Sequence, residues 1–151
     1  EWERLLAAER HMQSVVPGAV LVGRTAAALH AGHRRSLDGD HVLEDLRSRF
    51  DEVLADLEAA AGWQTSRVQR PVVILGTLDG MMTGIRQLRR TKALETELVG
   101  GLKVPTLAEM ARIKAWRRGS KRRQRARDCS RRDAICGLTG SSSSTRSARK
   151  R

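Results

Sequence analysis

The sequence of 151 residues contains no tyrosine, one phenylalanine, three prolines and two cysteines. No apolar run approaches the roughly 20 residues that a transmembrane helix needs, so a membrane-spanning segment is not expected. The first ten residues mix acidic and basic side chains, which is not typical of a signal peptide. The cysteines, Cys129 and Cys136, lie in a polar stretch without a pair of histidines beside them, which argues against a zinc site. A reducing, cytoplasmic location is therefore expected.

The positive charge of the chain is concentrated at one end. The formal net charge is +12, and residues 117–151 hold 13 Lys and Arg against 2 acids, so they carry +11 and residues 1–116 carry the remaining +1. Hydrophobic residues make up 40% of the chain, which is enough for the modest core of a single domain. We predict a folded domain over 1–116 and a basic, low-complexity, largely disordered tail over 117–151.

The most informative stretch combines a strand, a glycine turn, a helix, a basic turn and a pair of acids. These parts are residues 19–22, Gly23, residues 25–31, residues 33–36, and Asp38 with Asp40. In a strand, Asp38 and Asp40 are two residues apart, so both side chains point to the same face. The pattern predicts a strand that presents two carboxylates beside the beginning of a helix.

This arrangement suits phosphate and metal chemistry. The N–H groups and the dipole at a helix N-terminus favour a phosphate, and Gly23 can take backbone angles that other residues avoid. Mg²⁺ is usually held by one or two carboxylates together with substrate phosphates, and it can align a hydroxyl for phosphoryl or nucleotidyl transfer. The alternative interpretation is a solvated turn, because Asp-Gly is an ordinary turn dipeptide.

The order of these residues resembles the first motif of the nucleotidyltransferase superfamily, and in detail that of the AbiEii/AbiGii-type toxin nucleotidyltransferases. The matching segments are Gly23-Arg24-Thr25, His33-Arg34-Arg35-Ser36 and Asp38-Gly39-Asp40. The resemblance implies that Asp38 and Asp40 are catalytic metal ligands. It also implies a nucleotide-binding set, which consists of Gly23, Arg24, Thr25, Arg34 and Ser36. Arg24 departs from the family pattern, which has a second glycine there.

The resemblance covers roughly residues 16–116 and implies an α/β (α+β) fold, with a small mixed β-sheet flanked by helices. The residue pattern predicts helices over 2–14 and 42–61, strands over 63–70, 72–78 and 82–88, a hairpin over 94–104, and a helix that begins with a capping box at Thr106. Asp79-Gly80 is typical of the tight turn between two of these strands. In the last helix, Leu107, Met110, Ile113 and Trp116 are expected to form the buried stripe.

Other candidate residues follow later in the chain. The resemblance implies that Lys114, which follows the spacing of Val104 and Leu107, approaches the active site and contacts nucleotide phosphate; the alternative is a surface lysine. In the superfamily a third carboxylate often comes from a later strand, and Asp79 is the acid in this region, although a hairpin turn explains it as well. Thr83, Arg86 and Arg89 are further candidates for substrate contact, or a solvated strand face.

The resemblance implies an enzyme that transfers a nucleotide from an NTP to an RNA or protein acceptor with Mg²⁺, as the toxin-like component of a toxin–antitoxin system. An antitoxin protein is the partner that this implies. Two alternatives stand beside it: a catalytically inactive family member, favoured by Arg24 and by the altered tail, and a basic protein that binds nucleic acid through the phosphates. The tail is either a native nucleic-acid-binding segment or a divergent, out-of-frame end, because the composition changes abruptly after Trp116.

Overall fold

The computed structural model describes residues 1–32 and 36–115. The chain divides into two units, Glu1–Ala111 and Arg112–Arg151, and the fold described here is that of the first unit. The predicted disorder of the tail and the two cysteines lie outside the described residues. None of the described helices has the length and apolar character that crossing a membrane requires.

A five-stranded mixed sheet forms the centre of the fold, in the strand order β1-β2-β5-β4-β3. Its strands are β1 (Val20–Val22), β2 (Asp38–Leu43), β3 (Trp63–Gln69), β4 (Val73–Leu78) and β5 (Met81–Gln87). Strand β2 runs parallel to β5, and the other neighbouring pairs are antiparallel. A separate two-stranded hairpin consists of β6 (Thr96–Val99) and β7 (Leu102–Pro105).

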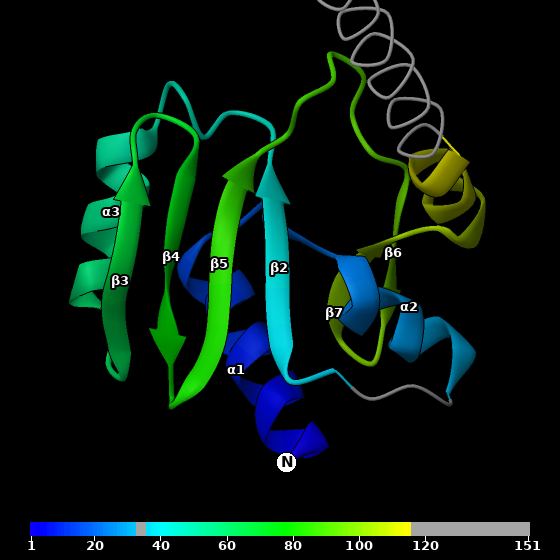
Figure 1. The fold of residues 1–151 in the computed structure, drawn as a ribbon, viewed down its shortest axis with the longest axis horizontal. Coiled ribbons are helices and arrows are strands. Elements are labelled where there is room, and N and C mark those ends of the chain that lie inside the picture. The colour runs from blue at the N-terminus through cyan, green and yellow to red at the C-terminus, as the bar shows by residue number, and fades with distance from the viewer. Residues whose placement is uncertain (33–35, 116–151) are drawn as a thin grey trace, which may run out of the picture. The chain divides into compact units, whose positions relative to one another are not determined.

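Two helices cover one face of the sheet. These are α1 (Trp2–Val15) and α3 (Phe50–Ala59), which lie behind the sheet in Figure 1. Their buried side chains form the main core with residues of β2, β4 and β5; this core includes Met12, Val16, Leu43, Phe50, Val53, Leu57, Ile74, Leu78 and Ile85. The helix α2 (Gly23–Ala31) follows β1 directly, and residues 107–115 are also helical.

The opposite face of the sheet, called the open face below, has no described helix in front of β4 and β5 (Figure 1). Its exposure follows from the alternation of side chains along each strand. In β2, Gly39, His41 and Leu43 are buried, while the residues between them are half-buried. The register carries this alternation across the sheet, because Asp38 pairs with Met82 and Asp40 pairs with Gly84. The two acids therefore lie on the open face.

Most predicted elements are confirmed. The strands before and after Asp79-Gly80 form the predicted hairpin, and the second hairpin turns at Gly100-Gly101. At the predicted capping box, the backbone N–H of Glu109 donates to Oγ1 of Thr106 at 3.2 Å, which is the N-cap half of the box, and the N–H of Thr106 donates to the carbonyl of Glu95.

Two predictions about helices are wrong. The helix expected over 42–61 begins only at Phe50, because Val42 and Leu43 continue β2 and pair with β5. The helical spacing of apolar residues is present from Phe50 onward. At Val42 and Leu43, however, the alternation of buried and half-buried residues that is typical of a strand decides the structure. Leu107 was expected in a buried stripe and is instead 63% exposed.

Candidate active site

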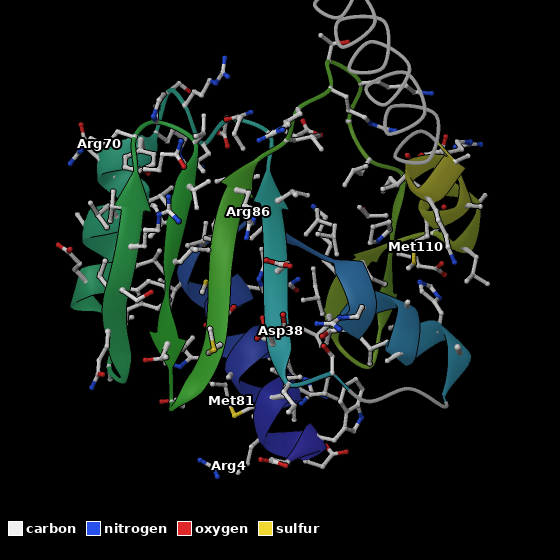
Figure 2. The ribbon with its side chains drawn as sticks, in the orientation of Figure 1. Arg4, Asp38, Arg70, Met81, Arg86 and Met110 are labelled. Carbon is white, nitrogen blue, oxygen red and sulfur yellow. The ribbon has the colours of Figure 1, made fainter. Side chains whose placement is uncertain are left out.

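Asp38 and Asp40 occupy the open face at the beginning of β2. Their side chains are 45% and 44% exposed, so both carboxylates are accessible to solvent without being free of protein contacts. Figure 2 shows Asp38 near the beginning of β2, the strand that lies beside α2. The predicted D-x-D geometry, two acids on one face of a strand, is therefore present.

Gly23 brings the beginning of α2 next to this acid pair. Val22 pairs with Asp40 across β1 and β2, and Gly23 follows with a φ of +79°, which L side chains rarely adopt. A Cβ at position 23 would lie 3.9 Å from Oδ2 of Asp40, so the chain turns close to that carboxylate. Among the residues that the structure describes, no side chain caps the N-terminus of α2. Its first N–H groups are thus available to an anion beside the acids.

Two hydroxyl groups hold Asp38 in place. Thr25 is 1% exposed, and its Oγ1 donates to the backbone carbonyl of Asp38 at 2.6 Å. Ser36 is 7% exposed, and its Oγ lies 2.7 Å from Oδ1 of Asp38, to which it donates. Both residues were predicted to contact nucleotide, and that role stays a prediction. In the structure the Ser36 hydroxyl contacts the carboxylate of Asp38, and the Thr25 hydroxyl contacts its backbone carbonyl.

Each carboxylate also faces one arginine. Nη2 of Arg24 lies 3.5 Å from Oδ1 of Asp38, and Nε of Arg86 lies 3.4 Å from Oδ1 of Asp40. Arg24 comes from the first turn of α2, whereas Arg86 comes from β5, which borders β2 (Figure 2). The acid pair is therefore surrounded by two cations from different elements.

The neighbouring strand supplies no third carboxylate on this face. The residues of β5 that share the open face with the acids are Met82, Gly84 and Arg86, by the parallel register. Asp79 lies in the turn before β5, where its Oδ2 is 3.2 Å from Nδ1 of His11 on α1. Its contact is thus with a helix on the covered face, and the turn interpretation accounts for it.

A buried polar cluster, which sequence reasoning missed, lies directly behind the acids on the covered face. Oε2 of Glu9 from α1 accepts a hydrogen bond from Oγ1 of Thr83 at 3.1 Å and lies 3.3 Å from Nδ1 of His41. Glu9 and His41 are 0% exposed, and a Cβ at Gly39 would overlap the Glu9 carboxyl group. This places Thr83 behind the sheet, so the expected substrate contact by Thr83 is wrong.

Burial sets the protonation of this cluster. It raises the pKa of Glu9 to about 8, an effect that the Thr83 hydrogen bond opposes and the charges of Asp40 and Asp38 reinforce. Burial lowers the pKa of His41 to about 3. The sequence held a signal for Glu9, because it stands four residues after Leu5 and three before Met12, on the apolar stripe of α1.

The donor set of the open face fits a hard cation that brings other ligands with it. Carboxylate oxygens are the ligands that Mg²⁺ prefers, and two of them on one face match its usual protein contribution. Within residues 1–32 and 36–115, no three His, Cys, Asp or Glu side chains are grouped to hold a metal ion. Phosphate oxygens and water would therefore have to complete its coordination.

The other predicted residues add no further contact to this description of the acids. Arg34 lies outside the described residues. Lys114 belongs to the second unit, and its role stays a prediction. Arg89 is exposed just after β5. A groove of about 530 Å³, which His11, Arg49 and Asp56 help to line, contains none of the predicted site residues.

The comparisons with known proteins support the fold. The sequence matches no protein-family model, and no curated protein is significantly similar to it. The structure is similar to the crystal structure of "a putative nucleotidyltransferase (TM1012) from Thermotoga maritima", with a TM-score of 0.59 and 14% identity over 86% of this chain and 94% of that one. The chain therefore has a nucleotidyltransferase-like fold.

Two Helicobacter pylori structures are more distant. JHP933 matches with a TM-score of 0.45 and 15% identity, over 72% of this chain and 52% of that one. A "putative nucleotidyltransferase" matches with a TM-score of 0.45 and 16% identity, over 72% and 53%. This chain thus spans about half the length of these two proteins.

Proposed function

We propose that the protein binds a nucleoside triphosphate with Mg²⁺ at Asp38 and Asp40 and transfers a nucleotide from it to an acceptor. The observation that carries this proposal is the placement of the two half-exposed carboxylates on the open face, beside the N-terminus of α2, which no side chain of the described residues caps. Two carboxylates that suit a metal ion and N–H groups that suit an anion adjoin there, as a metal-bound triphosphate requires. The nucleotidyltransferase-like fold supports the same interpretation.

In this proposal each group has one task. Asp38 and Asp40 hold the ion, which when bound would neutralise phosphate charge and help to align the acceptor. Thr25 and Ser36 fix Asp38 in its position, and the N–H groups of α2 bind phosphate oxygen. The acceptor oxygen forms a bond to the α-phosphorus, the bond to pyrophosphate breaks, and the hydroxyl proton passes to water.

For the acceptor, the proposal relies on the sequence resemblance to the AbiEii/AbiGii-type toxins. It favours an RNA or protein hydroxyl as acceptor, a toxin-like role and a cognate antitoxin as partner. The basic residues 117–151 are suited to hold an RNA through its phosphates, with an affinity that falls as salt rises.

A second candidate function is nucleotide binding without transfer. The observation that favours it is the absence of a carboxylate among Met82, Gly84 and Arg86, the β5 residues that share the open face with the acids. No acid of β5 is therefore placed to take the acceptor proton.

Calorimetric titration with a panel of Mg²⁺–NTPs tests the proposal. The wild-type protein is compared with the variant Asp38→Asn/Asp40→Asn and with Asp56→Asn/Glu58→Gln. The control removes two exposed acids of α3 and so changes the net charge equally. Binding that depends on Mg²⁺ and is lost only in the D-x-D variant supports a site at the acids. Equal binding by all three proteins would contradict it.

Transfer is then measured with an NTP labelled at the α-phosphate, incubated with total RNA or with protein. Label that enters an acceptor with the wild type, and not with the D-x-D variant, supports the enzyme. Binding without any incorporation would support the second candidate.

A further inference from the structure

Each acid of the site already faces a positively charged side chain of the protein itself. Arg24 faces Asp38 at 3.5 Å, and Arg86 faces Asp40 at 3.4 Å. Two carboxylates on one face repel each other, and a divalent cation normally relieves this repulsion. Here two guanidinium groups relieve it instead, so a cation that enters has to replace them.

These two contacts are suited to exchange. The side chains of Arg24 and Arg86 are 80% and 51% exposed, and each contact is longer than a tight charged hydrogen bond. Exposed ion pairs of this kind are weak, because water screens them and two long side chains must be held in place. The guanidinium groups can therefore leave the carboxylates at little cost when a better anion is offered.

A triphosphate is such an anion. A guanidinium group has a planar set of donors that fits two phosphate oxygens at once. Arg24 stands in the first turn of α2, beside the N–H groups that favour phosphate, and Arg86 stands on the strand next to the acids. Because both arginines already contact the acid pair, both stand beside the place where the proposed site would hold phosphates.

We propose that Arg24 and Arg86 form an exchangeable lock on the acid pair. In the free protein they hold Asp38 and Asp40; when a nucleoside triphosphate enters with its metal ion, they release the acids and bind the phosphates. This inference rests on the proposed function, because it concerns the same site. It assigns Arg86 as a substrate contact that also selects metal-bound nucleotide over free metal.

The lock makes a specific statement about coupling. A metal ion alone must displace two arginines that then have no new anionic partner, so the affinity of the site for free metal is reduced. A metal ion together with a triphosphate gives the displaced cations new partners, so the two ligands favour each other's binding. Removing either arginine should therefore tighten the binding of free metal and weaken the binding of nucleotide with metal, two effects of opposite sign.

The experiment measures both affinities on the full chain. Mn²⁺ binding is followed by electron paramagnetic resonance, first alone and then with the α,β-methylene analogues of the four nucleoside triphosphates. The variants are Arg24→Gln, Arg86→Gln and both together. The matched control is Arg67→Gln, which removes an exposed arginine of the edge strand β3. Thermal unfolding checks that all four variants are folded.

For each single variant we expect affinity for Mn²⁺ alone to rise about two- to fivefold, as loss of a weak exposed pair implies. Affinity for the analogue with Mn²⁺ should fall by a similar factor, while Arg67→Gln changes neither. Unchanged metal affinity in both variants would overturn the lock. Tighter binding of both ligands would also overturn it, since the arginines would then be a block without a phosphate role.

The two proposals fail in different ways. If the wild type binds the analogues through Asp38 and Asp40 but the arginine variants behave like Arg67→Gln, the function stands and the lock is wrong. If no analogue binds the wild type, the proposed function fails and the exchange of partners fails with it. Tighter Mn²⁺ binding by the variants would then identify the arginines as a permanent block.

Discussion

Oε2 of Glu9 lies 3.3 Å from Nδ1 of His41, and both side chains are fully buried on the covered face of β2. Because side chains alternate along β2, this pair lies behind the strand that presents Asp38 and Asp40 on the other side. Burial raises the pKa of Glu9 and lowers that of His41, so both groups are uncharged at neutral pH. The strand that carries Asp38 and Asp40 therefore rests on a buried pair without net charge.

The stability of the fold should depend on pH through this pair. The contribution of Glu9 is fully present below its ordinary pKa of 4.5 and is lost as pH rises through about 8. The contribution of His41 is present above 6.5 and is lost as pH falls toward about 3. We expect the free energy of unfolding to be greatest between pH 4.5 and 6.5 and to decline above that window. Urea unfolding across the pH range measures this.

Glu9→Gln is the variant that isolates the effect. It keeps the size of the side chain and cannot ionise, so the decline of stability above pH 6.5 should become shallower, while the decline at acidic pH remains. A wild-type stability that rises between pH 6.5 and 8 would contradict the protonation assigned to Glu9.

Gly39→Ala should destabilise the protein. A Cβ at this position would overlap the Glu9 carboxyl group, and overpacking of a core typically costs about 1–3 kcal/mol. The measurement is urea unfolding of Gly39→Ala, of Glu9→Ala, and of the double variant. Because Glu9→Ala removes the obstructing atoms, Gly39→Ala should cost less in that background. Equal costs in both backgrounds would show that the obstruction is not Glu9.

Thr25→Val should lower stability by about 1 kcal/mol, the typical value of a buried hydrogen bond. The hydroxyl of Thr25 donates to the carbonyl of Asp38, and valine keeps the shape while it removes the donor. Thr25→Ser keeps the hydroxyl and should retain most of the bond. If Thr25→Val is as stable as the wild type in urea unfolding while Thr25→Ser is destabilised, the methyl group and not the hydrogen bond is what matters.

The predictable part of this site was local in sequence. The apolar run before Gly23 and the spacing of Asp38 and Asp40 together predicted a strand, a turn and two acids on one face, and all three are present. Local spacing also predicted the turn at Asp79-Gly80. Each of these depends on the preferences of a few neighbouring residues, which a single sequence contains.

The rest depended on long-range register. Arg86 reaches Asp40 only because β5 lies parallel to β2 and next to it, a pairing that no local pattern states. The same pairing keeps Val42 in a strand, although its spacing also fitted the helix that begins at Phe50. The sequence does show Glu9 as a polar residue in the apolar stripe of α1. Its burial against β2 could not be predicted, because it depends on Gly39 lying opposite.

A comparison of the two single variants Gly23→Ala and Gly32→Ala separates the effect of backbone strain from an effect on nucleotide binding. Both glycines have positive φ, +79° and +67°, at the two ends of α2, and an added Cβ would meet nothing closer than 3.9 Å at Gly23 and nothing within 4 Å at Gly32. Each alanine should therefore cost about 1–2 kcal/mol of backbone strain, measured by urea unfolding. Only Gly23 adjoins Asp40, so only its variant should weaken Mg²⁺–NTP binding in calorimetry. Equal nucleotide affinity in the two variants would mean that the turn at Gly23 serves the fold and not the ligand.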